Sequence, residues 1–282
     1  MRLGGLRCQV ISDGRCKFDA GVMFGIVPRA LWTRRAKPDR RNRLSFGLNC
    51  LLIRTPRRNI LVDNGVGPKE PPQTKALFGL GPSRLLRGLK AVGLGPGDIN
   101  TVVLTHLHWD HAGGSTYLDR KSGETIPTFP RATYLVQRAS WEEATHANER
   151  NTAGYHRDDF MPVFERGLVK LLDGDEEVAP GVDALVTGGH APGHQVVTVT
   201  QGDQRLCFLG DLIPSHLHLP LPYVSAYDEF PLASLDYRRQ LLERAARERW
   251  LLIFQHDLGQ LCGTVTAGPR GYQFTPSEWG ED

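Results

Sequence analysis

Side chains that commonly bind metals gather in one short stretch of the chain. His106, His108, Asp110 and His111 fall within six residues, directly after the apolar run at residues 101–104. Each of these groups is strongly polar, and burying them together would be costly without something to coordinate. The stretch therefore indicates a metal site.

A buried strand is expected to deliver these residues. Residues 101–104 are β-branched or apolar and follow a turn-like Gly-Pro-Gly-Asp sequence, so the strand should end where the polar residues begin. His106 and His108 would point the same way in an extended chain, while Asp110 and His111 lie beyond a turn. One loop could thus supply two clusters of ligands. The Ala-Gly-Gly sequence at residues 112–114 should let the backbone pass close to the metal.

The same pattern, an apolar run followed by a metal-binding side chain, occurs three more times. Residues 182–187 precede His190, residues 206–209 precede Asp211, and residues 251–254 contain a strand-like run that ends before His256. Strands that end at a common edge bring such residues together. We therefore expect these three side chains to complete the site.

These residues resemble the metallo-β-lactamase fold superfamily. The superfamily motif His-x-His-x-Asp-His is matched by His106, His108, Asp110 and His111. Residues 61–65 resemble the early Asp-x-Gly turn, and residues 189–194 resemble the later histidine motif. The resemblance implies an α/β fold, an αββα sandwich of two mixed β-sheets flanked by helices.

The resemblance also implies a dinuclear centre with two divalent metal ions. Zn²⁺ is the expected metal, and Mn²⁺, Fe²⁺ and Co²⁺ are alternatives. The ligands of the first metal would be His106, His108 and His190. Those of the second would be Asp110, His111 and His256, with Asp211 as the bridge between the metals. Asp63 and His194 would orient ligands rather than bind a metal themselves.

The bridging Asp211 narrows the implied activity. Classical metallo-β-lactamases generally lack this aspartate, so antibiotic hydrolysis is not the first expectation. Residues 19–24, 210–214 and 226–228 resemble the branch that contains methyl parathion hydrolase and the quorum-quenching lactonases. That resemblance implies a hydrolase in which a metal-bridging hydroxide cleaves an ester-type bond of a small molecule: a lactone, a carboxyl ester or a phosphotriester. Asp110 and Asp211 would be the catalytic carboxylates.

Further residues are candidates for the substrate pocket. Met23 and Phe24 lie in an irregular apolar segment that could line a pocket mouth, although a core or dimer contact explains them as well. Residues after Asp211 could supply a proton donor, and the candidates are His216, His218, Tyr223 and Tyr227. Packing accounts for the tyrosines, and solvent for the histidines, about as well. We interpret His146 and His156 as ordinary surface or packing histidines.

Three other functions stay open. Histidine and carboxylate ligands also suit iron, so an iron-dependent oxidoreductase resembling a persulfide dioxygenase is one alternative. A metal-stabilised binding module without catalysis is another, although the complete ligand set argues against a decayed site. Nucleic-acid processing is supported only by the basic run at residues 34–43. No aromatic residue is interleaved with that run, which favours a solvated loop.

The composition is that of an ordinary globular protein, which we expect to be a single domain over residues 1–282. The chain has 34 Lys and Arg against 31 Asp and Glu, and 40% of its residues are hydrophobic. The nearly balanced charge does not indicate any particular class of binding partner. It contains no apolar stretch of membrane-spanning length and begins without the apolar segment of a secretory signal. We expect a cytoplasmic protein with no membrane partner, and a homodimer is one option. The 5 scattered cysteines argue against a disulfide scaffold.

The remaining pattern predicts a sheet-rich protein with a few helices. We expect a first strand at residues 7–12 that ends in an Asp-Gly turn, a hairpin of residues 49–54 and 59–63, and a surface loop or lid at residues 65–82. An amphipathic helix at residues 83–92 should bury Leu85, Leu86, Leu89 and Val92. A capping box of Ser140 and Glu143 predicts a helix at residues 141–148. The other expected elements are strands at 132–136, 168–172 and 196–200 and a long helix at 231–249.

Overall fold

A computed structural model describes residues 1–269 and 271–278 of the chain. The fold divides into two compact units. Unit 1 comprises residues 1–14 and 48–176, and unit 2 comprises residues 15–47 and 177–282. Strands β2 (Leu6–Asp19) and β3 (Arg43–Arg54) run from one unit into the other along the sequence. The single-domain organisation stays a prediction.

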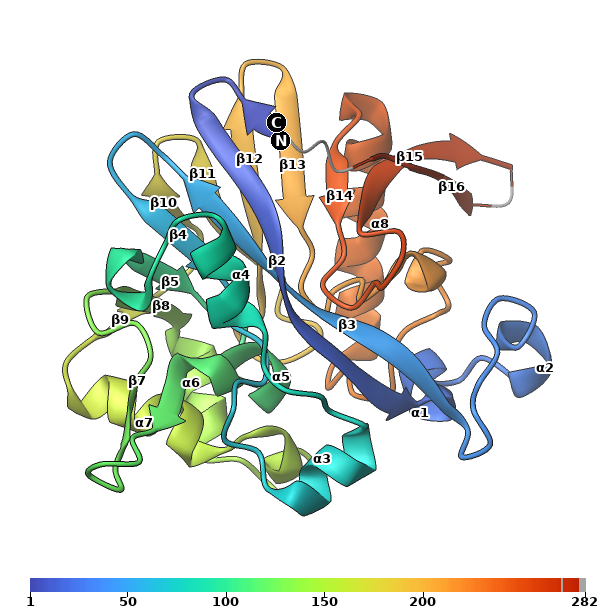
Figure 1. Cartoon of the computed structure of the whole chain (residues 1–282). Coiled ribbons are helices and arrows are strands. Elements are labelled where there is room, and N and C mark those ends of the chain that lie inside the picture. Colours follow the sequence, from blue (N-terminus) through green and yellow to red (C-terminus); the bar gives the residue numbers. More distant parts are fainter. Residues whose placement is uncertain (270, 279–282) are drawn as a thin grey trace. The chain divides into compact units, whose positions relative to one another are not determined.

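The sheet of unit 1 is mixed, as predicted (Figure 1). Its strands follow the order β1-β2-β3-β4-β5-β8-β9. The hairpin of β3 and β4 is antiparallel, whereas β4, β5, β8 and β9 pair in parallel. The remaining strands are β1 (Arg2–Leu3), β4 (Asn59–Val62), β5 (Thr101–Val103), β8 (Thr133–Gln137) and β9 (Val169–Leu172). A separate ribbon pairs β6 (Thr116–Leu118) with β7 (Thr125–Pro127).

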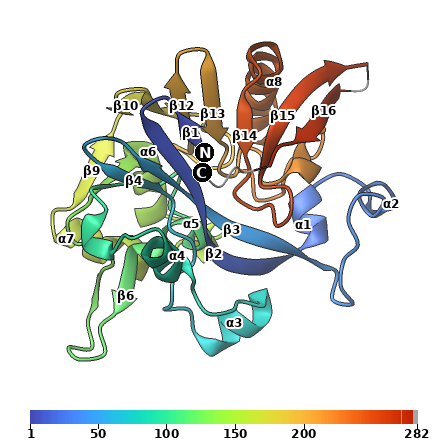
Figure 2. The same cartoon turned by 45° about the horizontal axis from the view of Figure 1, so that its top comes forward.

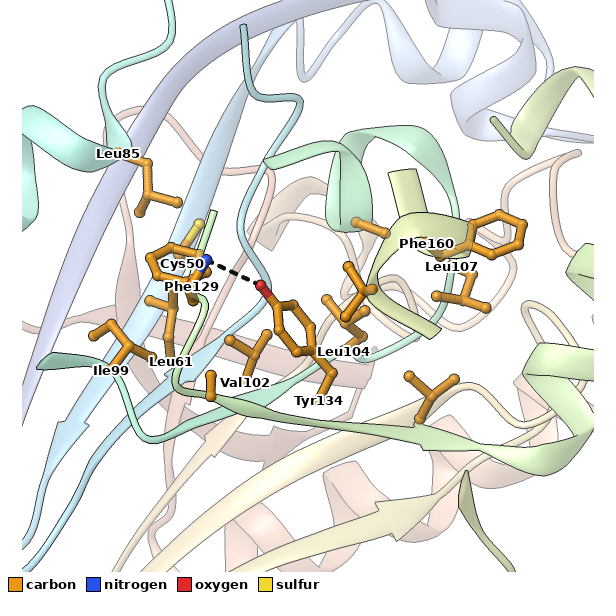
Figure 3. Close-up of a cluster of buried hydrophobic side chains, with 14 of the residues drawn as sticks. Cys50, Leu61, Leu85, Ile99, Val102, Leu104, Leu107, Phe129, Tyr134 and Phe160 are labelled. Atoms are coloured by element: carbon orange, nitrogen blue, oxygen red, sulfur yellow. Dashed lines mark hydrogen bonds between the residues drawn. The ribbon is translucent and has the colours of Figure 1, made fainter. Parts of the chain in front are cut away.

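The core of unit 1 lies between this sheet and its helices (Figure 3). The helices are α3 (Pro72–Phe78), α4 (Leu85–Ala91), α5 (Trp109–Ala112), α6 (Arg138–Thr145) and α7 (Arg157–Glu165). Apolar side chains of β4 and β5 pack with Leu85 of α4 and Phe160 of α7 in one buried cluster. The Tyr134 hydroxyl accepts a hydrogen bond from the Phe129 N–H at 3.2 Å and donates to the Ser115 carbonyl at 3.3 Å. Its burial therefore leaves the one polar atom of that side chain satisfied.

The turn predicted at Asp13-Gly14 is wrong, because β2 continues through both residues to Asp19. Asp13 is 2% exposed, and its carboxylate accepts backbone hydrogen bonds from Val66 and Gly67 and from Arg84 and Leu85 at 2.9–3.1 Å. The Ser83 hydroxyl donates to the same group. The acidic side chain thus fixes both ends of a loop rather than making a local turn.

The segment predicted as a surface loop or lid at residues 65–82 contains the short helix α3. The Lys69 ammonium donates to the Gly113 carbonyl at 2.5 Å and to the Thr116 carbonyl at 3.0 Å, and it pairs with Asp159 at 2.8 Å. On α3, the Phe78 ring lies 4.9 Å from the Trp109 ring. These contacts tie the loop to the segment that carries the predicted metal ligands.

His156 also packs against Trp109. The two rings are stacked at 6.1 Å, and His156 Nδ1 lies 3.1 Å from Glu70 Oε1. The hydrogen bond to Glu70 raises the pKa of His156, although burial opposes the shift.

Two predicted helices differ in detail from the observed ones. Helix α6 begins at Arg138, directly after β8 ends at Gln137, so Ser140 is buried inside the helix instead of capping it. Gln137 occupies the N-cap position, and its side-chain amide donates to the Gly174 carbonyl instead of capping the helix. On α4, Leu85 and Leu89 are buried as expected, but Leu86 is 44% exposed. Leu86 therefore does not belong to the buried face of α4, contrary to the prediction.

Unit 2 also contains a mixed sheet, in the order β10-β11-β12-β13-β14-β15-β16. Its strands are β10 (Glu176–Ala179), β11 (Val182–Val186), β12 (Gln195–Gln201), β13 (Gln204–Phe208), β14 (Leu251–Ile253), β15 (Cys262–Gly268) and β16 (Gly271–Pro276). Only β13 and β14 pair in parallel; the other pairs whose register is defined are antiparallel. Strands β10, β15 and β16 were not predicted.

The long helix α8 (Pro231–Glu248) covers part of this sheet, and Figure 2 shows it beside β14 and β15. Leu241, Leu242 and Ala245 of α8 pack with Leu252, Phe254 and Val265 in a second buried cluster. Two short helices, α1 (Ala20–Phe24) and α2 (Arg29–Trp32), follow β2. The Asp19 carboxylate caps α1 by accepting from Gly21 and Val22 at 2.8 and 3.1 Å.

All 5 cysteines are buried as free thiols. Burial raises the pKa of Cys8 and Cys207 to about 12 and that of Cys262 to about 11. In residues 1–269 and 271–278, no helix combines the length and apolar composition that a membrane span requires.

Candidate metal centre

In unit 1, the predicted ligand loop begins where β5 ends at Val103. The strand lies between β4 and β8 in parallel register, and its three residues are fully or almost fully buried. His106 follows in an irregular turn, His108 precedes α5, and Asp110 and His111 lie within α5. The expected strand and loop are therefore present, and the turn between the two ligand pairs is one turn of helix.

Asp63 orients this loop from the end of β4. Its carboxylate accepts from the Thr105 N–H at 2.7 Å, from the Thr105 hydroxyl at 2.8 Å and from His111 Nδ1 at 3.0 Å. Asp63 is fully buried and adopts φ +55°, an uncommon backbone conformation outside glycine. The strained turn aims one carboxylate at three donors, which fits the predicted orienting role of Asp63.

The tautomers of His106 and His111 follow from these partners. Because the Thr105 hydroxyl donates to Asp63, its oxygen accepts from His106 Nδ1, which lies 3.1 Å away. His111 Nδ1 donates to Asp63 directly. In both neutral rings the lone pair is consequently on Nε2.

Two ring nitrogens of the loop approach each other closely. His106 Nε2 lies 2.8 Å from His108 Nδ1, and the His106 and His111 ring centroids are 4.0 Å apart. Asp110 is 6% exposed, and its Oδ1 lies 3.8 Å from His111 Nε2. Convergent nitrogen and carboxylate donors in a buried loop form a donor set suited to a divalent transition metal.

Gly113 and Gly114 pack against backbone rather than beside a ligand. A Cβ at Gly113 would lie 2.3 Å from the Val66 carbonyl oxygen, and one at Gly114 would lie 2.1 Å from that of Asn64. The predicted close approach is present, but its partner is the segment after β4. The two glycines let the loop dock there.

In unit 2, Asp211 lies between two histidines. Its Oδ2 is 3.2 Å from His190 Nε2, and its Oδ1 is 3.0 Å from His256 Nε2. His190 Nδ1 lies 3.0 Å from the Asp228 carboxylate, and His256 Nδ1 lies 2.8 Å from the Gly47 carbonyl oxygen. Both Nδ1 atoms therefore donate, so in its neutral form each ring turns its Nε2 lone pair toward a carboxylate. A cation between these groups resolves that repulsion, so the residues fit a metal.

His194 holds the backbone of Asp211. Its Nε2 accepts from the Asp211 N–H at 3.0 Å, and its Nδ1 lies 2.6 Å from the Thr187 hydroxyl. It is fully buried. This geometry fits the predicted role of an orienting residue and not a ligand.

The predicted pocket residues have varied surroundings within unit 2. Phe24 is stacked between Trp32 at 5.5 Å and His218 at 5.0 Å, with the Tyr223 ring at its edge. His218 is buried, its Nε2 donates to the Met23 carbonyl at 3.0 Å, and burial lowers the pKa of its imidazole to about 3. Met23, Phe24 and His218 thus take part in packing, and contact between substrate and any of these residues stays a prediction.

His216 and Tyr227 are more accessible. His216 is partly exposed and pairs with the Asp257 carboxylate. Tyr227 is 45% exposed and meets the Phe18 ring at 6.1 Å, edge to face. Their role in a substrate pocket also stays a prediction.

Sequence reasoning missed two orienting residues, Thr105 and Asp228. Thr105 directly precedes the first ligand, and its hydroxyl connects Asp63 to His106. Asp228 lies 38 residues beyond His190 in the chain. Thr105 could have been predicted from its position next to His106. For Asp228, the only indication in the sequence was the Ala-Tyr-Asp stretch that contains it. All seven predicted ligands belong to the His and Asp groups that could hold a metal ion among the described residues.

Comparison with known proteins shows similarity to one superfamily. The sequence model of the metallo-beta-lactamase superfamily matches residues 46–256. An N-acyl homoserine lactonase from Bacillus sp is 30% identical over 90% of this chain and 94% of its own length. The crystal structure of a probable metal-dependent hydrolase from Staphylococcus aureus superposes with a TM-score of 0.90, at 26% identity and 99% coverage of both chains.

A second solved structure carries a ligand. An N-acyl homoserine lactone hydrolase with the product N-hexanoyl-L-homoserine bound at its catalytic metal centre has a TM-score of 0.69, at 26% identity over 92% of this chain and 96% of that one.

Proposed function

The chain belongs to the metallo-beta-lactamase superfamily and is a lactonase-like hydrolase. We propose that it binds two divalent metal ions, with Zn²⁺ as the preferred metal, and that it hydrolyses an ester-type bond. Among the substrates considered, lactones come first, and N-acyl homoserine lactones are the first to test, since the similar proteins carry that activity in their names. Carboxyl esters and phosphotriesters follow.

In this proposal, both units contribute ligands. The first metal is held by His106, His108 and His190, and the second by Asp110, His111 and His256. Asp211 binds both. The support within unit 1 is the approach of His106 Nε2 to His108 Nδ1 at 2.8 Å. The support within unit 2 is the pair of Nε2 lone pairs that face one carboxylate.

One observation carries the proposal. The two oxygens of Asp211 face the Nε2 atoms of different histidines, at 3.2 and 3.0 Å, while a hydrogen bond at each Nδ1 fixes the tautomer. Each oxygen of Asp211 thus lies beside a histidine that the proposal assigns to a different metal, as expected of a bridging carboxylate.

When bound, a pair of divalent cations supplies Lewis acidity for the substrate carbonyl and lowers the pKa of a water toward neutrality, so that hydroxide is available as the nucleophile. The chain's own residues manage the protons. In lactone opening, the water oxygen bonds to the carbonyl carbon, the ring C–O bond breaks, and the leaving alkoxide takes a proton. Asp110 has the chemistry to accept the proton of the water and pass it to that alkoxide. Asp63, Asp228 and His194 keep the ligands in place.

The test of this function is a metal-defined panel of lactones, aryl esters and phosphotriesters on one preparation. Asp211→Ala should reduce hydrolysis to background and lower the metal content measured by elemental analysis. Asp236→Ala is the matched control, because Asp236 is an exposed residue of α8 paired with Arg239. Near-normal turnover by metal-poor Asp211→Ala would overturn the proposal.

Removal of the metal gives a second test. Prolonged chelation should silence the purified protein, and Zn²⁺, Mn²⁺ or Co²⁺ should restore hydrolysis. Full activity in a sample shown to be metal-free would contradict metal catalysis. Iron in the purified protein together with oxygen uptake on a persulfide would instead support the oxidoreductase alternative.

A further inference from the structure

His108 is held differently from the other predicted histidine ligands. In four of them a hydrogen bond at Nδ1 fixes the ring, and the partners are Thr105, Asp63, Asp228 and Gly47. In His108, Nδ1 is instead the atom that lies 2.8 Å from His106 Nε2. Gly154 and Tyr155 pack against the same ring.

Gly154 lies against that edge. A Cβ added to Gly154 would be 2.8 Å from Cδ2 and 3.1 Å from Nε2 of His108. The backbone of Gly154 is not in the left-handed region, so a side chain would be tolerated there by the backbone itself. Glycine is needed at this position for space beside the imidazole rather than for its conformational freedom.

Tyr155 contacts the same imidazole. The two ring centroids are 4.9 Å apart at an interplanar angle of 44°. Tyr155 is 7% exposed and belongs to the buried cluster of unit 1. Its ring therefore has little freedom to move away, and it limits rotation of the His108 ring.

The turn that presents these two residues is itself well fixed. Asn148 N–H donates to Asn151 Oδ1 at 2.8 Å, and Gly154 N–H donates to the Asn151 carbonyl at 2.8 Å. The Asn151 amide also donates to Glu143 on α6. A short 3₁₀ turn at Thr152–Gly154 completes the segment. Helix α6 thus supports the turn, and the turn supports His108.

We propose that Gly154 and Tyr155 are positioning residues that hold the His108 imidazole with Nδ1 toward the metal. This inference rests on the proposed function, since it concerns a ligand of the proposed centre. The two residues restrict the His108 ring by packing, and hydrogen bonds at Nδ1 fix the rings of its four counterparts. Groups that orient metal ligands typically change metal affinity roughly 10- to 100-fold when they are altered.

The first experiment compares Gly154→Ala with Gly97→Ala. A Cβ at Gly97 meets no atom within 4 Å, so that variant controls for adding a methyl group. Metal affinity is measured by competition with a chromophoric chelator, and ligand geometry by the absorption spectrum of the Co²⁺-loaded protein. Gly154→Ala should bind one of two metal equivalents roughly 10- to 100-fold more weakly and change the spectrum. Gly97→Ala should match the wild type.

The second experiment compares Tyr155→Leu with Tyr155→Phe and decides the matter if Gly154→Ala unfolds. Tyr155→Phe retains the ring and should keep the affinity and spectrum, whereas Tyr155→Leu should weaken the same metal equivalent. Wild-type affinity and spectrum in both Gly154→Ala and Tyr155→Leu would overturn the inference and leave the proposed function standing. Failure of the wild-type protein to bind metal would overturn the proposed function, and the inference with it.

Discussion

Unit 1 contributes four predicted ligands from one loop, whereas unit 2 contributes three from three separate loops. In unit 1 a single carboxylate, Asp63, accepts from both donors of Thr105 and from His111. In unit 2 each ligand has its own partner: Asp228 for His190, Gly47 for His256 and His194 for Asp211. In unit 1 one carboxylate thus supports His111 directly and His106 through Thr105, whereas in unit 2 each ligand has a partner of its own.

This difference indicates which substitutions should destabilise the fold most. Loss of a shared orienting group disturbs the folded loop and several ligands together. Loss of an individual partner disturbs one ligand and leaves the surrounding strand in place. Variants in the two units should therefore separate effects on folding from effects on metal binding.

The largest effect is expected for Asp63→Ala. The substitution leaves three buried donors of Thr105 and His111 without their acceptor and places alanine at φ +55°. We expect the free energy of unfolding to fall by on the order of 3 to 6 kcal/mol. The measurement is urea denaturation in the presence of chelator, so that metal binding does not contribute.

Asp63→Asn is the matched control for this change. It keeps one acceptor oxygen, and asparagine tolerates the left-handed backbone better than alanine does. Its loss of stability should be clearly smaller. A loss below about 1 kcal/mol in Asp63→Ala would contradict the shared role of this carboxylate.

A smaller and more local effect is expected for Asp228→Ala. The substitution removes the carboxylate that His190 Nδ1 contacts, so metal affinity should fall roughly 10- to 100-fold with a modest change in stability. Competition with a chelator measures the affinity, and Asp228→Asn, which retains an acceptor, should restore much of it. If Asp228→Ala unfolds more readily than Asp63→Ala, the larger role of the shared carboxylate in folding is contradicted.

The smallest effect concerns the pH dependence of stability in unit 1. The pKa of His156 is raised above 6.5 chiefly by the Glu70 hydrogen bond, with Asp159 acting in the same direction and burial and Lys69 in the opposite one. A raised folded-state pKa means that the stabilisation is complete below about 6.5 and is lost as the pH rises through the folded value.

His156→Gln should therefore be less stable than the wild type in mild acid and approach it in mild alkali. The His156 side chain is 38% exposed, so solvent screening should keep the difference under about 1 kcal/mol. Denaturant titrations across this pH range measure it, and a difference that grows with pH would contradict the assignment.

The parts of the fold predicted from the sequence were those with local signals. An apolar run that leads into His106 or His256 is visible in the order of residues alone, and so is the long amphipathic helix α8. The glycine pair at residues 113–114 was also recognised, although its partner was not. These features depend on neighbours in the chain.

The features that were missed depend on distant partners. Asp13 was interpreted as a turn residue because its partners at Val66 and Leu85 lie far along the chain. Strand β16 has no fully buried residue, because its side chains are all exposed or half-buried. Asp228 has no neighbour in sequence that marks it as a partner of His190. Metal assignment, a cytoplasmic location and a homodimer stay predictions.

The five buried thiols give each unit an internal reporter of its own opening. Cys8 and Cys50 belong to unit 1, and Cys16, Cys207 and Cys262 belong to unit 2. Exclusion from solvent keeps all five groups from reacting with alkylating reagents until the surrounding structure opens, and burial also raises the pKa of Cys8, Cys50, Cys207 and Cys262. Pulsed alkylation read by peptide mass spectrometry would therefore time the exposure of each unit in the unmodified chain, without introducing a label.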